Sequence, residues 1–192
     1  MAHPRYPSLY QINTRIWLHE LSNKLSRPAT LDDIPDADLD HIADYEFDWL
    51  WLLGVWQTGP AGRLVSLTQP EWRTEYESSL PDFTDADVCG SPFAIRAYDL
   101  NADFGNVDSL PRFREHLQKR GMRLLLDFVP NHVALDHPWV LSHPDYFLEG
   151  TEADLARSPL NFCRIAGSGG PLILAHGRDP YFPGWPDTLQ LN

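Results

Sequence analysis

The chain has 192 residues, of which 43% are hydrophobic and 12% aromatic, a composition typical of a folded globular protein rather than a disordered one. Its 27 acidic residues outnumber 15 basic ones, giving a formal net charge of −12 at pH 7 that argues against nucleic acid or anionic membrane as a partner. The N-terminus has no signal-peptide core, no run approaches the about 18 apolar residues of a membrane span, and the two cysteines suggest neither disulfides nor zinc, so the cytoplasm is the expected location.

The first half of the chain alternates between strand and helix patterns. Residues 9–18, "LYQINTRIWL", are predicted to form a buried strand that runs into a loop, because β-branched and aromatic residues favour the pleated state. Within residues 26–47, Leu39, Ile42 and Ala43 recur at helical spacing. Residues 48–56, "DWLWLLGVW", are apolar on both faces, which is typical of a strand in a parallel sheet covered by helices.

A long excursion over residues 57–105 separates this pattern from the next one and contains one short predicted helix, "QPEWRTEYESSL". Residues 106–121 form an amphipathic pattern with Leu110, Phe113 and Leu117 on one face and Gly121 placed to end the helix. "MRLLLDFV" reads as the third strand. The order predicts an α/β protein with three adjacent parallel strands near residues 9–13, 48–55 and 122–129.

The last third of the chain has a different pattern. Residues 137–159 are expected to be a loop with a short helix, and "NFCRI" and "LILAH" flank "AGSGGP" in the manner of a small hairpin.

The third strand and its exit carry the polar residues that point to a site. "LLLDFVPNHV" places Asp127 inside an apolar strand and Asn131 and His132 at its carboxyl end, where parallel α/β sheets gather function. A buried carboxylate needs a partner, so an arginine or another strong donor is expected to face Asp127. Spacing alone also allows a structural buried acid and a loop histidine with no further role. A metal set of His132, His137 and His143 fits no standard zinc spacing.

The same stretch resembles the first signature region of the alpha-amylase family of glycoside hydrolases (family 13), in which an Asp precedes an Asn-His pair. Upstream, "GSPFAIRAYDLNADFGNVDSL" is similar to the segment before the preceding helix of that family, with Phe93, Tyr98 and Phe104-Gly105 at the corresponding places. "YQINTRIW" and "DWLWLLGVW" resemble its first two barrel strands, and "WPDTLQLN" resembles the motif that closes its inserted domain.

The resemblance implies the N-terminal part of a catalytic domain. The expected fold is the first three βα units of a (β/α)8 TIM barrel plus the inserted domain B, with the barrel incomplete. Residues 1–132 would hold the three barrel strands, and residues 133–192 would be the domain B-like excursion after strand three. The remainder of the same catalytic domain would then be a partner of this chain.

The resemblance also assigns roles to individual residues. His132 would hydrogen-bond the sugar beside the cleaved bond, and Phe93 stands where the family usually has a stacking Tyr. Asp127 would be the structural acid of the site, and both it and Tyr98 are expected to belong to the substrate-binding residues. Asn131 resembles a calcium ligand of the amylases, but Gln190 stands where calcium-binding members place an Asp, which argues against calcium and leaves no expected cofactor.

No catalytic residue is assigned within the chain. Retaining glycosidases need two carboxylates about 5 to 5.5 Å apart, and the resemblance places the nucleophile and the acid/base downstream of Asn192. The parent protein is therefore expected to be a retaining glycosidase or transglycosidase acting on an α-glucan or α-glucoside in carbohydrate metabolism, with the isolated chain inactive. The alternatives are a non-catalytic barrel relative used for protein assembly or sugar binding, and an unrelated parallel α/β protein.

Overall fold

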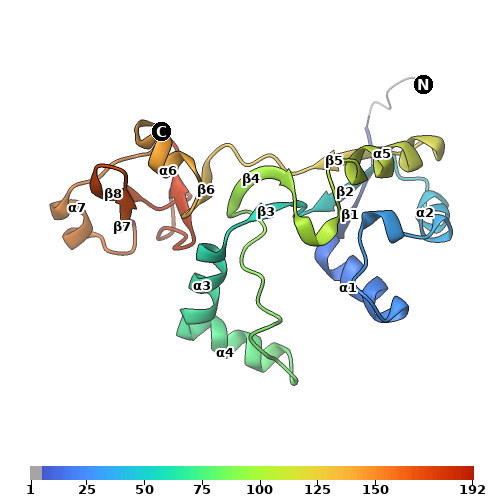
Figure 1. The fold of residues 1–192 in the computed structure, drawn as a ribbon, viewed down its shortest axis with the longest axis horizontal. Coiled ribbons are helices and arrows are strands. Elements are labelled where there is room, and N and C mark those ends of the chain that lie inside the picture. Colours follow the sequence, from blue (N-terminus) through green and yellow to red (C-terminus); the bar gives the residue numbers. More distant parts are fainter. Residues whose placement is uncertain (1–5) are drawn as a thin grey trace. The chain divides into compact units, whose positions relative to one another are not determined.

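The computed structural model describes residues 6–192, which divide into two compact units (Figure 1). Unit 1 comprises Met1–Gln57, described from Tyr6 onward, and Asp99–Phe128. Unit 2 comprises Thr58–Tyr98 and Val129–Asn192. The boundaries of these compact units differ from those of the segments 1–132 and 133–192 that the family resemblance implies. The division into these two segments stays a prediction.

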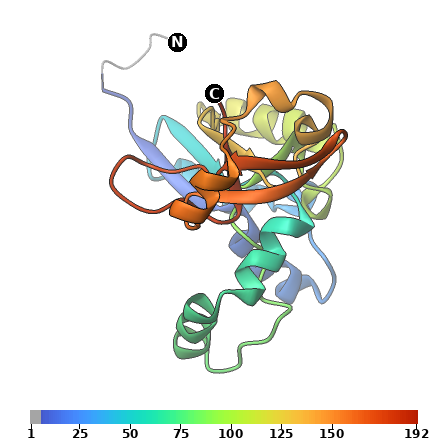
Figure 2. The same ribbon diagram turned by 90° about the vertical axis from the view of Figure 1, so that its left-hand side faces the viewer.

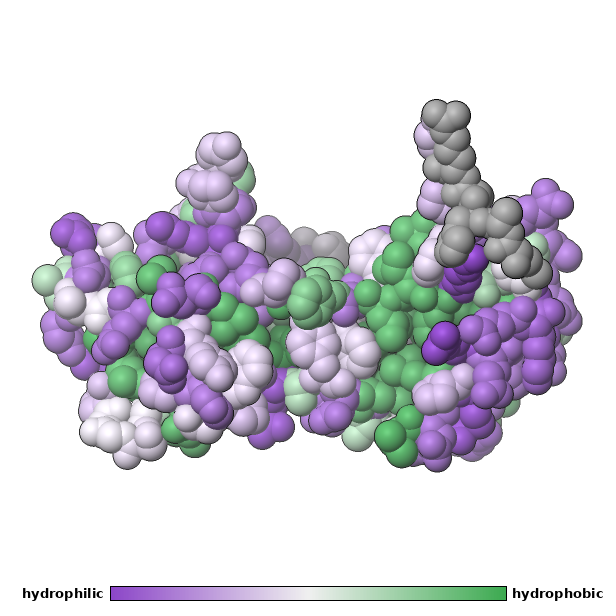
Figure 3. Space-filling view, turned by 90° about the horizontal axis from the view of Figure 1, so that it is seen from above, coloured by the Kyte–Doolittle hydropathy of each residue, from purple (hydrophilic) through white to green (hydrophobic). Residues whose placement is uncertain are grey.

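Unit 1 is built on a three-stranded parallel sheet of β1 (Leu9–Asn13), β2 (Trp49–Leu53) and β5 (Arg123–Leu126), in the order β1-β2-β5. The predicted parallel strands are therefore observed. In register, Tyr10 lies beside Leu50, which lies beside Leu124. Apolar residues, drawn in green, gather on the right-hand part of the surface in Figure 3.

Three helices and two short 3-10 turns pack with this sheet: α1 (Thr14–Leu25), η1 (Leu31–Asp33), α2 (Asp36–Ala43), η2 (Ala102–Phe104) and α5 (Ser109–Lys119). Helix α5 has the predicted apolar face, with Phe113 and Leu117 in the core. Arg120 follows α5 and pairs with Asp36 and Asp40 of α2, at 2.8 and 2.6 Å. These ion pairs fix the two helices against each other.

Helix α1 corrects the prediction that residues 14–18 continue a strand into a loop. The Asn13 side chain accepts a hydrogen bond from the Ile16 amide at 3.2 Å and so caps the helix. Leu18 and Leu21 then face the core. Because Ile16 and Trp17 favour strands locally, the cap and this buried face decide the structure.

The chain passes from unit 1 to unit 2 in β3 (Trp56–Thr58) and returns in β4 (Ile95–Leu100), and these two strands pair with each other. Between them lie α3 (Pro60–Thr68), which was not predicted, and α4 (Pro70–Ser79), which matches the predicted short helix. Both helices begin with proline at the first position, where the missing amide hydrogen costs no hydrogen bond.

The rest of unit 2 contains two antiparallel strand pairs. The β7–β8 hairpin (Phe162–Gly167 and Gly170–Ala175) is the predicted one and faces the viewer in Figure 2. The second pair, β6 (His132–Ala134) with β9 (Thr188–Gln190), was not predicted. The region expected as a loop with one short helix holds α6 (Trp139–Ser142), η3 (Pro144–Tyr146) and α7 (Glu152–Arg157). No helix in the described part of the chain is both long and apolar enough to cross a membrane.

Candidate functional site

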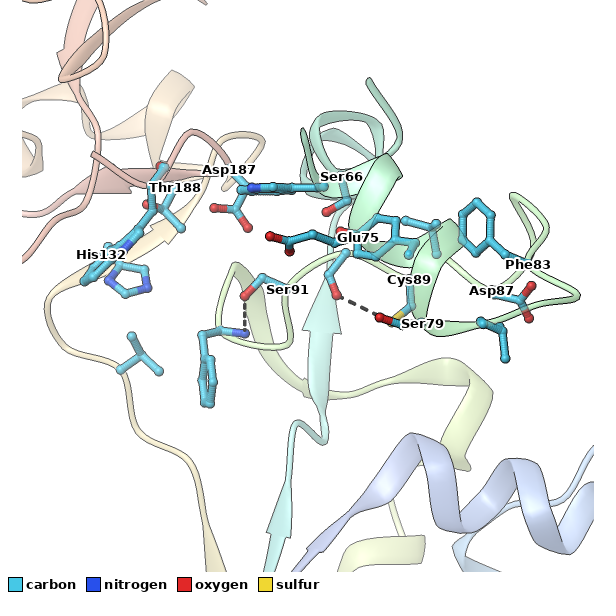
Figure 4. A pocket seen from close by; sticks show the side chains of 18 residues that line it. Ser66, Glu75, Ser79, Phe83, Asp87, Cys89, Ser91, His132, Asp187 and Thr188 are labelled. Carbon is cyan, nitrogen blue, oxygen red and sulfur yellow. Dashed lines mark hydrogen bonds between the residues drawn. The ribbon is translucent and has the colours of Figure 1, made fainter. Parts of the chain in front are cut away.

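Unit 2 contains a cavity of about 850 Å³, which falls within the usual size of a small-ligand pocket. Four parts of unit 2 line it: Ser66 of α3, one face of α4, the loop that follows α4, and the residues around the β6–β9 pair. Figure 4 shows these side chains turned toward a common space. The cavity therefore brings together segments that lie more than 50 residues apart in the sequence.

His132 and Phe93 both line this cavity, so the structure brings together two of the predicted sugar-binding residues. The His132 ring donates a hydrogen bond to the backbone carbonyl of Phe93, and its Nδ1 lies 3.2 Å from Asn131 Nδ2. Phe93 keeps 38% of its surface exposed. These two contacts orient the imidazole, and the exposed ring beside it offers a flat apolar surface that is suited to contact a sugar face.

Burial lowers the pKa of His132 more than the hydrogen bond to Phe93 raises it. The imidazole is therefore neutral at pH 7, with one nitrogen as donor and the other as acceptor. A neutral ring carries no charge into the cavity.

Asn131 and Gln190 are paired through their side-chain amides. Gln190 Nε2 donates to Asn131 Oδ1 at 3.0 Å and to the Asn131 carbonyl at 2.9 Å, and it lies 3.2 Å from the Leu191 carbonyl. The oxygen of Asn131 that would bind calcium thus accepts a hydrogen bond. Within the described residues, no three His, Cys, Asp or Glu side chains are grouped in a way that could hold a metal ion.

Tyr98 does not line the cavity but holds a residue that does. Its hydroxyl accepts a hydrogen bond from the Val129 amide at 2.8 Å and donates to the Val129 carbonyl at 3.2 Å. Val129 is part of the cavity wall. The direct substrate contact assigned to Tyr98 by resemblance stays a prediction.

Asp127 lies in unit 1, directly after β5 rather than inside a strand as predicted. Its carboxylate accepts hydrogen bonds from Trp51 Nε1 at 3.0 Å and from the Gly54 amide at 2.6 Å. Gly54 has a φ of 75°, a conformation that glycine adopts without strain. The strong donors expected for this buried acid are thus an indole and a backbone amide of the same unit, and its place in a substrate site stays a prediction.

Sequence reasoning missed the half of the cavity that α4 forms. Trp72, Glu75, Tyr76 and Ser79 line it from one face of the helix, because residues three, four and seven apart share a face. That spacing was visible in the sequence, whereas the presence of Asp187 in the same cavity lining was not. Asp187 is 4% exposed and also lines the cavity.

Part of the chain that holds this site matches a known family. Residues 92–156, about a third of the chain, match the family described as "Alpha amylase, catalytic domain". The match confirms that this part of the chain resembles the alpha-amylase family. The matched region contains the four residues expected to bind the substrate, His132, Phe93, Asp127 and Tyr98.

The individual relatives of this chain are distant. It is 28% identical over 148 residues to the alpha-1,4-glucan:maltose-1-phosphate maltosyltransferase of Burkholderia pseudomallei, covering 74% of this chain and 11% of that protein. It is 28% identical over 86 residues to the amino acid transporter heavy chain SLC3A1 of Mus musculus, covering 40% of this chain and 11% of that protein.

The fold also matches solved structures of the family. An alpha-amylase from Lactobacillus plantarum superimposes with a TM-score of 0.57 and 20% identity, covering 97% of this chain and 32% of that one. At this identity the likeness establishes the fold alone. The chain spans about a tenth of the length of the two curated relatives and about a third of the solved amylase.

Proposed function

We propose that this chain forms part of an α-glucan- or α-glucoside-acting enzyme, a retaining glycosidase or transglycosidase of the alpha-amylase family. In this proposal it supplies the first three βα units of the barrel and one wall of the sugar pocket. The observation that carries the proposal is the meeting of His132 and Phe93 at one cavity, within the region that matches the family's catalytic domain. The names of the glucan maltosyltransferase and the amylase agree with this class of substrate.

Sugar binding by His132 can be tested with the 192-residue chain. Ligand-observed saturation-transfer NMR would follow maltose binding to the parent and to His132→Ala. Loss of a hydrogen bond in a partly buried pocket should weaken binding about tenfold. The matched control is His143→Ala, since His143 is exposed and lies outside the cavity lining. Equal maltose binding by the parent and His132→Ala, with both folded by circular dichroism, would remove His132 from the sugar site.

Catalysis itself is expected to need residues beyond those assigned here. The family resemblance matches no residue of this chain to the nucleophile or to the acid/base, so we propose that the isolated chain has no glycosidase activity. The measurement is release of a chromogenic aglycone from an α-glucoside by the purified chain. Turnover that survives repurification and disappears in Glu75→Gln or Asp187→Asn would contradict this proposal and place catalysis in the cavity.

A second candidate is a non-catalytic relative that uses the barrel for protein assembly. The similarity to the amino acid transporter heavy chain favours it. The two candidates differ in one measurable property. Maltose binding that depends on His132 supports the enzyme, whereas a folded chain that binds no sugar and associates with another protein supports the assembly role.

A further inference from the structure

The half of the cavity formed by α4 differs chemically from the end that holds His132 and Phe93. It combines apolar rings with carboxylates, whereas the other end presents a neutral imidazole. The apolar wall comes from Trp72 and Tyr76 of α4 and from Phe83, whose ring centroid lies 5.7 Å from that of Tyr76. Such a wall offers flat surfaces on which a sugar ring can lie.

The charged groups that line the cavity are all acidic. They are Glu75, Asp87 and Asp187, and the lining within the described residues contains no lysine or arginine. The two arginines of α3 and α4 make other contacts. Arg63 donates to the carbonyls of Val88 and Asp85 at 2.7 and 2.6 Å. Arg73 pairs with Glu77 and Asp85, at 2.9 Å each.

Asp187 is the acid that points most directly to a ligand. It is 4% exposed, and the hydrogen bond described for its carboxylate comes from its own backbone amide. Figure 4 shows the carboxylates of Asp187 and Glu75 turned toward the same part of the cavity. A buried carboxylate with so few donors is costly unless a ligand or water supplies more of them.

Sugar hydroxyls are the donors that fit this arrangement. A carboxylate can accept up to four hydrogen bonds, and adjacent hydroxyls present two donors at once. The aromatic wall supplies the apolar contact that a sugar face requires. A phosphate group, by contrast, brings only acceptors and up to two negative charges, and it would meet carboxylates without a cation to balance them.

We propose that the part of the cavity between α4 and Asp187 binds the group next to the sugar at His132, and that it selects uncharged, polyhydroxylated groups and rejects phosphorylated sugars. Asp187 and Glu75 accept the hydroxyl hydrogen bonds, and Trp72 and Tyr76 supply the apolar face. This proposal rests on the proposed function and names its substrate class. It separates this chain from its relative whose name specifies maltose-1-phosphate.

The test compares one uncharged and one phosphorylated disaccharide on the 192-residue chain. Maltose and maltose-1-phosphate would be titrated by saturation-transfer NMR, and the ratio of their dissociation constants measured at low and high salt. At low salt the parent should bind maltose at least about tenfold more tightly, since like charges a few ångströms apart repel strongly in a partly enclosed site. Raising the salt to about 1 M, where the Debye length is near 3 Å, should reduce that ratio.

Two variants test whether the cavity carboxylates cause the selectivity, because each keeps the shape of the side chain and removes its charge. Asp187→Asn and Glu75→Gln should each bring the ratio at least about threefold closer to one and make it less dependent on salt. The matched control is Glu71→Gln. It makes the same change of charge one turn earlier on α4, at an exposed residue outside the cavity lining, and should leave the ratio unchanged.

The outcomes distinguish a failure of the proposed selectivity against phosphate from a failure of the proposed sugar pocket. If neither sugar binds the parent, the proposed sugar pocket fails. If maltose binds and maltose-1-phosphate binds equally well or better, the pocket stands and the selection against phosphate is wrong. Selection that persists unchanged in both cavity variants would also overturn it, because the carboxylates would then not be its cause. If one variant fails to fold, the other variant and the salt dependence of the parent still show whether the carboxylates cause the selectivity.

Discussion

The side-chain amide of Gln190 hydrogen-bonds to that of Asn131 across the β6–β9 pair, with Nε2 and Oδ1 3.0 Å apart. Three oxygen atoms, two from Asn131 and the carbonyl of Leu191, lie within 3.2 Å of this one nitrogen. Oxygen atoms that converge in this way are the ligands that a hard cation prefers. In this chain an amide group occupies the place where they meet.

This arrangement predicts that Gln190→Asp creates a calcium site. The substitution removes the N–H donors and adds a carboxylate beside the amide and carbonyl oxygens of Asn131. Millimolar calcium should then raise the melting temperature of the variant, and a chelator should reverse the rise, whereas neither addition changes the parent. Gln190→Asn is the control because it is equally short but uncharged. A parent that loses stability in chelator would show that its own site binds a metal.

Gly59 should not tolerate a side chain. A Cβ atom at this position would overlap the carboxylate of Asp136, which accepts a hydrogen bond from the Ala61 amide at 3.2 Å in the first turn of α3. Gly59→Ala must therefore displace Asp136 or the start of α3, at a cost of about 1–3 kcal/mol in the free energy of unfolding measured with urea. Gly169→Ala is the control, since its Cβ would meet nothing within 4 Å. Equal stability of the two variants would mean that Asp136 moves aside freely.

The parts of the fold that could be predicted are those whose pattern is local. The three parallel strands follow from continuous apolar runs, and α5 follows from an apolar face that Gly121 terminates with a φ of 80°. Helix α3 was missed because Gly59 and Gly62 read as loop residues. Gly62 is buried in the helix, and the proline at its first position was the available signal.

The candidate site was predictable only in part, for a similar reason. Asn131 and His132 form a motif that can be recognised from ten residues. By contrast, Gln190, Asp187 and the face of α4 reach the cavity through contacts between segments that lie far apart in the chain. No local pattern reports such contacts, and an acid such as Asp187 in a proline-rich stretch looks like any solvated turn residue.

Asp127 should be sensitive even to replacement by its own amide. Both carboxylate oxygens accept hydrogen bonds from N–H groups, those of Trp51 and Gly54. Asp127→Asn would turn one oxygen into an NH2 that faces another donor, so we expect a loss of about 1–3 kcal/mol in the free energy of unfolding. The control is Asp99→Asn, which should change the free energy of unfolding little because Asp99 is exposed. If Asp127→Asn unfolds at the same urea concentration as the parent, these two hydrogen bonds contribute no net stability.

The stability of unit 2 should fall as the pH drops below about 6.5, the ordinary pKa of histidine. Burial lowers the pKa of His132, His137 and His176. In this pH range the unfolded chain binds more protons than the folded one, so stability is complete above 6.5 and is lost as the pH falls toward the folded pKa values. Asp187 acts in the opposite direction, because burial raises its pKa and the folded state then holds its proton more tightly.

His176→Asn separates these contributions. The His176 ring donates from Nδ1 to the Thr188 carbonyl at 2.9 Å, and the asparagine amide can make the same hydrogen bond without titrating. Urea unfolding between pH 5 and 8 should therefore show a shallower pH dependence for His176→Asn than for the parent. The exposed His19, changed to asparagine, should leave the slope as it was. If the unfolding free energy of His176→Asn depends on pH as steeply as that of the parent, His176 takes up protons equally in the folded and unfolded states. This buried imidazole would then not oppose folding at acidic pH.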